Sequence, residues 1–123
     1  LPDFFLHAVK AMPGKRGEVW LRVQGYPLYR SVDAGDSFTS LAQVTDVTDF
    51  AFGHPAPNRQ NLTVFVAGTV NGVKGVFRSD DVTALPGDGA GATWVQVSTP
   101  QQRLSNVTFL EGDRRVYGRV YVG

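Results

Sequence analysis

Residues 28–33 (LYRSVD) recur 48 positions later as residues 76–81 (VFRSDD). Before each copy comes a short apolar segment, a polar turn and a strand-like segment rich in valine and aromatic residues. Three such opening segments align, at residues 7–25, 49–68 and 106–123. The first two units also end in similar segments, at residues 37–41 and 93–97. The chain is therefore internally repetitive.

The repeated unit contains four short strands in about 50 residues, which is the size of a β-propeller blade. Helix patterns are nearly absent, and 14 glycines and 7 prolines punctuate the chain. We predict an all-β fold of β-propeller blades, each with four antiparallel strands. The predicted blades cover residues 4–44 and 48–98, with half a blade at 105–123. Closed propellers hold about four to eight blades, so these roughly two and a half blades are expected to be part of a larger ring.

Charge and composition exclude several classes of partner. The 12 Lys and Arg residues nearly balance 11 Asp and Glu residues, so no basic excess exists to neutralise nucleic-acid phosphates. No apolar run approaches the length of a membrane span. His7 and His54 have no other ligand type at metal-binding spacing. We expect no nucleic acid, membrane, metal or cofactor as a partner.

Residues 31–38 (SVDAGDSF) match the pattern S/T-x-D-x-G-x-S/T-W/F, known as the Asp-box. The second unit carries the pattern in two parts, residues 79–81 and 91–94, separated by residues 82–90, which we predict to be a surface insertion. An aspartate in such a turn accepts hydrogen bonds from turn amides, the glycine supplies an unusual backbone conformation, and the aromatic ring packs beneath. The pattern predicts structural roles for Ser31, Asp33, Gly35, Phe38, Ser79, Asp81, Gly91 and Trp94.

No catalytic residue is predicted within the chain. Asp80 and Asp81 are adjacent and would point to opposite faces of a strand, while residues 111–113 read as a turn. No Ser-His-Asp set can be assembled from the two histidines. Aromatic side chains on the expected strands could stack on sugars, but their positions favour packing between blades: Trp20, Phe65, Trp94 and Tyr121.

Residues 64–81, with 91–97 and 113–123, resemble the C-terminal propeller of glycoside hydrolase family 74. Residues 17–38 and 44–53 fit the same resemblance. Members of that family are xyloglucan-specific endo-β-1,4-glucanases and related xyloglucan oligosaccharide hydrolases. The resemblance implies two seven-bladed propellers facing each other across a cleft, and an inverting reaction that uses one Asp as general acid and one as base.

The resemblance also implies where this chain would belong. It matches the last blades of the second propeller, with both catalytic Asp residues upstream, so it would supply scaffold and cleft wall and be inactive alone. The complete enzyme would be secreted, would act on xyloglucan or a related β-glucan, and would pack this chain against the remaining blades. The alternative is a non-catalytic Asp-box propeller module that binds a glycan or a protein and is completed by self-association.

Blade geometry predicts which loops face a ligand. Loops at residues 24–27, 45–49, 70–74 and 98–104 would share one face, opposite the Asp-boxes. On them, Tyr26 could stack on a sugar ring, and the other candidates could bond hydroxyl groups: Gln24, Asp49, Asn71 and Gln101. Asn61 and Asn106 begin N-x-Thr sequons and are candidate N-glycosylation sites in a eukaryotic secreted protein.

Overall fold

The computed structural model describes residues 7–23, 26–85, 88–97 and 110–122. The first sheet is antiparallel throughout, in the order β1-β2-β3-β4. Its strands are β1 (His7–Ala11), β2 (Val19–Val23), β3 (Leu28–Ser31) and β4 (Thr39–Ser40). Gln24 and Gln101, both predicted to contact substrate, and the candidate glycosylation site Asn106 lie outside the described residues.

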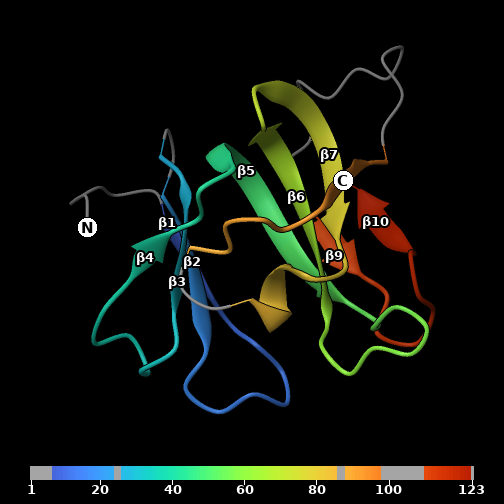
Figure 1. Ribbon diagram of the computed structural model, residues 1–123, viewed down its shortest axis with the longest axis horizontal. Helices are drawn as coiled ribbons and strands as arrows, with labels where there is room; N and C mark the ends of the chain where they lie inside the picture. Colours follow the sequence, from blue (N-terminus) through green and yellow to red (C-terminus); the bar gives the residue numbers. More distant parts are fainter. Residues whose placement is uncertain (1–6, 24–25, 86–87, 98–109, 123) are drawn as a thin grey trace.

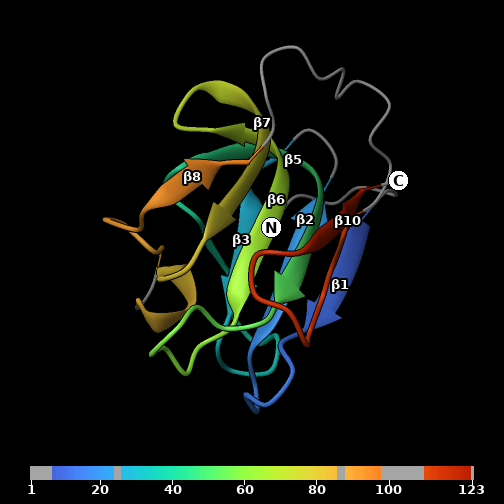
Figure 2. The same cartoon turned by 90° about the vertical axis from the view of Figure 1, so that its right-hand side faces the viewer.

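A second four-stranded sheet repeats this arrangement, in the order β5-β6-β7-β8. Its strands are β5 (Val44–Gly53), β6 (Thr63–Val70), β7 (Val73–Ser79) and β8 (Trp94–Gln96). A third sheet contains β9 (Leu110–Gly112) and β10 (Val120–Val122), and a short 3-10 helix, η1 (Val82–Ala84), follows β7. Figures 1 and 2 show these sheets in succession along the chain. The predicted all-β fold with four-stranded antiparallel sheets is confirmed, and its division into blades stays a prediction.

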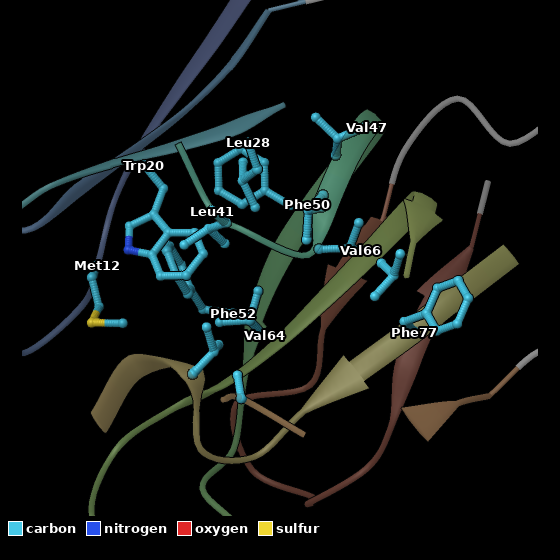
Figure 3. Close-up of a cluster of buried hydrophobic side chains, with 14 residues drawn as sticks. Met12, Trp20, Leu28, Leu41, Val47, Phe50, Phe52, Val64, Val66 and Phe77 are labelled. Atoms are coloured by element: carbon cyan, nitrogen blue, oxygen red, sulfur yellow. The ribbon is translucent and has the colours of Figure 1, made fainter. Parts of the chain in front are cut away.

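Two apolar clusters hold the sheets together. The larger cluster joins the first and second sheets (Figure 3), where the rings of Trp20, Phe50 and Phe52 pack with centroids 5.6–6.3 Å apart. The smaller one joins the second and third sheets around Phe65 and Leu110. Trp20 and Phe65 are both fully buried, which confirms their predicted packing role. Burial of such large rings supplies much of the free energy that holds neighbouring sheets in place.

The other two aromatic side chains on the predicted strands, Trp94 and Tyr121, are more exposed than Trp20 and Phe65. Trp94 is half-buried against the larger cluster. Tyr121, expected in the core, is 50% exposed on β10, and its hydroxyl donates to Asp113. The prediction for Tyr121 is therefore wrong in this structure, because no described segment packs on that side of the third sheet.

The first strand of the second sheet begins earlier than the sequence indicates. Residues 45–49, predicted as a loop, belong to β5, which pairs with β6 along its whole length. Two register shifts interrupt the pairing, and at one of them a Cβ on Gly68 would lie 2.1 Å from the Asp46 carbonyl oxygen. Only glycine permits this approach. The polar residues that suggested a loop are tolerated because Val44 and Val47 face the core.

The predicted turn at residues 111–113 is likewise partly strand, since Leu110–Gly112 forms β9. β9 lies directly against β5: a Cβ on Gly112 would come within 2.3 Å of the Phe52 carbonyl oxygen. The described helical structure is limited to η1, and no described helix is long and apolar enough to cross a membrane.

Candidate functional site

The predicted substrate-facing end of the sheets contains Tyr26 and Asn71, each in the connection between the second and third strands of its sheet. Figure 1 shows the β6–β7 hairpin at one end of the sheets and the turn between β3 and β4 at the other. Tyr26 is half-buried, and its backbone N–H donates to Val23 O at 3.0 Å. Asn71 is exposed and, with Gly72, has the positive φ angles typical of a two-residue hairpin.

Gln43, which belongs to no sequence motif, fixes the position of this hairpin. Its carbonyl oxygen accepts from Asn71 N at 2.9 Å. Its side-chain amide donates to Ala92 O at 2.8 Å and accepts from Trp94 Nε1 at 3.2 Å. One residue thus connects the hairpin through its backbone, and the outer strand β8 through its side chain, to the start of β5. Only the proximity of these segments in the fold identifies it, since no motif contains Gln43.

Asp49, predicted to bond a sugar hydroxyl from a loop, instead lies buried in β5. Its Oδ1 accepts from Lys10 Nζ at 3.1 Å, and its Oδ2 accepts from Leu110 N at 2.7 Å. Arg22 Nε lies 3.8 Å from Oδ1. Because both carboxylate oxygens are occupied, Asp49 connects all three sheets. Its predicted place on a ligand-facing loop is wrong.

The first Asp-box forms a closed network of hydrogen bonds around one carboxylate. Asp33 Oδ1 accepts from Ser31 Oγ at 2.7 Å and from Ser37 N at 2.9 Å, and Oδ2 accepts from Ser37 Oγ. These bonds, led by the one from the Ser37 hydroxyl, lower the pKa of Asp33 to about 2. Gly35 has φ +93° and lies against the Phe38 ring. The Asp33 carboxylate therefore accepts all of these hydrogen bonds from residues of its own turn.

The second Asp-box closes in space although its sequence is split. Asp81 Oδ1 accepts from Ser79 Oγ and from Thr93 N, both at 3.0 Å. These two bonds correspond to those from Ser31 Oγ and Ser37 N to Asp33. Gly91 also has positive φ, at +88°. The intervening residues therefore leave the turn geometry intact.

The segment 82–90 is not the surface insertion predicted from its sequence. Val82 and Thr83 are buried, because η1 packs into the interface between the first two sheets. The Arg30 guanidinium donates to the carbonyl oxygens of three residues in this segment: Val82, Thr83 and Leu85. The segment accepts one further bond, from Ala42 N to Asp88 O at 3.0 Å.

Arg30 is held in place by a buried carboxylate that the sequence analysis also missed. Glu18 is 1% exposed and accepts from Arg30 Nε at 3.1 Å and from Trp20 Nε1 at 2.8 Å. Lys15 Nζ lies 3.3 Å from the same carboxylate. The Arg-Ser dipeptide that both repeat units share is the sequence feature that indicates such a pairing. The Arg of the second unit, Arg78, also pairs with a carboxylate, that of Asp80.

In the described part of the chain, no group of three His, Cys, Asp or Glu side chains could hold a metal ion. The carboxylates examined above are committed to turns or to contacts between sheets. The geometry of this chain therefore defines a stack of propeller-type sheets with one end, around Tyr26 and Asn71, that presents short connections to solvent.

Comparison with family models gives no match. Among characterised proteins, the chain is 36% identical over 118 residues to a xyloglucanase of a Paenibacillus species and 38% identical over 118 residues to a xyloglucanase of Acetivibrio thermocellus. These alignments cover 92% and 95% of the chain, but 11% and 13% of the relatives. An oligoxyloglucan-reducing end-specific xyloglucanase of Emericella nidulans is 30% identical over 115 residues.

Solved structures agree with the sequence matches. A glycoside hydrolase family 74 enzyme of Niastella koreensis superposes with a TM-score of 0.80 at 30% identity, over 94% of this chain and 16% of that structure. A family 74 xyloglucanase of Xanthomonas campestris gives a TM-score of 0.74 at 26% identity over the whole chain and 16% of its own. The stacked sheets are thus of the kind found in β-propeller glycoside hydrolases. The chain belongs to glycoside hydrolase family 74 and spans about a tenth to a sixth of the lengths of these proteins.

Proposed function

We propose that this chain is the C-terminal propeller part of a secreted, xyloglucan-hydrolysing enzyme of the inverting endo-β-1,4-glucanase type. The observation that carries the proposal is 36–38% identity to two xyloglucanases over more than nine-tenths of the chain. In this role the chain supplies scaffold and part of the cleft wall, and the complete enzyme acts on xyloglucan outside the cell. The two catalytic Asp residues of the family belong to other parts of that enzyme.

Tyr26 and Asn71 are the proposed contributions of this chain to substrate binding. Both lie in connections between second and third strands, which share one face of a propeller. The Asp-boxes lie at the other end, where their carboxylates stabilise turns. Asn61, whose side chain is partly exposed, is a proposed glycosylation site if the enzyme is made by a eukaryote.

A segment replacement tests this function. In the Acetivibrio thermocellus xyloglucanase, the section that aligns with this chain is replaced by residues 1–123, and hydrolysis of xyloglucan is measured. We expect the chimera to hydrolyse xyloglucan, a deletion of the same section to lose activity, and the isolated chain to show no turnover. Turnover by the isolated chain, or a chimera that folds with the circular dichroism of the parent but is inert, would contradict the proposal.

A further inference from the structure

A second candidate binding surface lies at the opposite end of the sheets from Tyr26 and Asn71. There, the turn after β5 and the turn between β9 and β10 border an open groove of about 310 Å3. Its lining residues are His54, Pro55, Ala56, Pro57, Asn58, Arg59 and Tyr117. The volume is at the lower end of the range for small-ligand sites. Figure 1 shows both turns at the lower right of the molecule.

The backbone of this groove is fixed before any ligand arrives. Arg59 N donates to Ala56 O at 3.0 Å, and Asn58 adopts a left-handed conformation with φ +64°. The buried Thr63 hydroxyl donates to His54 O at 3.0 Å. His54 N donates to Asp113 O at 3.0 Å, which ties the two turns together. Such preorganisation lowers the entropic cost of binding.

The nearby carboxylates already accept hydrogen bonds from other groups. Asp80 accepts from Arg78 Nε at 3.1 Å and from the Tyr117 hydroxyl at 2.7 Å, and the Arg78 guanidinium lies over the Tyr117 ring. Asp113 accepts from the backbone N–H groups of Arg115 and Val116. These contacts leave the groove without a carboxylate for Arg59.

Two polar groups of the groove therefore have no hydrogen-bond or ion-pair partner within the described part of the chain. One is the exposed guanidinium of Arg59, a donor suited to a carboxylate. The other is His54 Nε2: because His54 Nδ1 lies 2.8 Å from the Pro55 carbonyl oxygen, Nδ1 carries the proton and Nε2 of the neutral ring accepts. A ligand that carries both a carboxylate and a hydroxyl group fits both.

We propose that this groove binds a uronic acid residue of an acidic glycan, with its carboxylate on Arg59 and a hydroxyl donating to His54 Nε2. The proline rings and Tyr117 supply the apolar surface that the carbon face of a sugar contacts. The exposed Arg114 and Arg115 on the adjoining turn add positive potential that attracts an anionic chain. The choice of a glycan over another hydroxy acid rests on the proposed function.

Titration of the chain with D-glucuronate, D-glucose and acetate, followed by backbone-amide NMR, tests this site. We expect glucuronate to shift the amide signals of residues 54–59 and 113–118, more strongly at low salt, and glucose and acetate to bind more weakly. Arg59→Gln should weaken glucuronate binding about tenfold, since it removes a charge-assisted hydrogen bond. Asn58→Gly, which keeps the positive φ, should preserve the site, and Arg16→Gln, on the β1–β2 turn, is the matched control.

Equal binding of glucose would overturn the role of charge, and equal binding of acetate would overturn the assignment to a sugar. Unchanged affinity in Arg59→Gln, or no shift at these amides, would overturn the site itself. The titration needs no hydrolysis, so its failure is distinct from an inactive chimera, which would count against the proposed function alone.

Discussion

The Asp33 carboxylate lies on an exposed turn, yet it accepts hydrogen bonds from two serine hydroxyls and one backbone amide. These bonds favour the charged form and lower the pKa of Asp33 from 3.8 to about 2. A carboxylate with a lowered folded-state pKa stabilises the fold above its unfolded pKa, and this contribution is lost as the pH falls through the folded value. We therefore expect stability that depends on Asp33 to disappear between about pH 4 and pH 2.

Replacing this carboxylate gives the corresponding test. Asp33→Asn should lower the free energy of unfolding at pH 7, and the difference from the unmodified chain should shrink as the pH falls from 4 to 2. Denaturant unfolding at several pH values measures both effects. Asp36→Asn is the control, because the exposed Asp36 carboxylate makes no hydrogen bond with the described residues. A pH-independent difference for Asp33→Asn would contradict the assignment.

Tyr26 permits a residue-scale test of substrate contact. In the chimeric enzyme, Tyr26→Ala should raise KM for xyloglucan by about two- to tenfold, the value of one aromatic stacking contact, and leave kcat nearly unchanged. Tyr121→Ala, at an exposed tyrosine on β10, is the control. If both variants match the parent chimera in KM, Tyr26 has no role in binding.

At the scale of elements, the contact between η1 and the first sheet depends on Arg30. Its side chain is 4% exposed, and its guanidinium bonds both the Glu18 carboxylate and three carbonyl oxygens of the segment 82–85. Arg30→Ala would leave a buried carboxylate and buried carbonyls without their main donor, which costs about 3–5 kcal/mol of folding free energy.

Arg78, which occupies in the second unit the position of Arg30 in the first, supplies a matched control. Arg78→Ala removes a partly buried pair with Asp80 and the contact of the guanidinium with the Tyr117 ring, and should cost about 1–2 kcal/mol. Chemical denaturation of both variants compares the two positions directly. Similar losses would mean that the segment 82–90 does not depend on Arg30.

The sequence predicts these elements unevenly, for physical reasons. The valine and aromatic alternation of β2 and β6 is a local signal, so the sequence predicts both as the valine-rich strands of the opening segments 7–25 and 49–68. The start of β5 was missed because Asp46 and Asp49 have low strand propensity, and the pairing with β6 overrides that preference. The burial of η1 was missed because its partner Arg30, itself held by Glu18, is more than 50 residues away in the sequence.

At the scale of the whole molecule, comparison of the two repeat units predicts which surfaces another sheet would cover. Leu41 N donates to Leu28 O in the first sheet, and Val97 N donates to Val76 O in the second, both at 2.8 Å. Leu41 and Val97 are thus equivalent, but Leu41 is 4% exposed beneath the second sheet and Val97 is 38% exposed. Val95, on the same side of β8, is also exposed. The outer part of the second sheet therefore exposes an apolar side chain, Val97, at a position that is covered in the first sheet, and adds a second one, Val95, beside it.

This uncovered surface leads to a prediction for the chain produced on its own. Burial of exposed valines favours association, so we expect the mass measured by analytical ultracentrifugation to rise with concentration. Val95→Lys combined with Val97→Lys should restore the 13.4 kDa monomer, because lysine on an outer strand opposes pairing through charge. Val32→Lys, at an exposed valine on the Asp-box turn, should not. A chain that stays monomeric at all concentrations would show that the exposed valines need no cover.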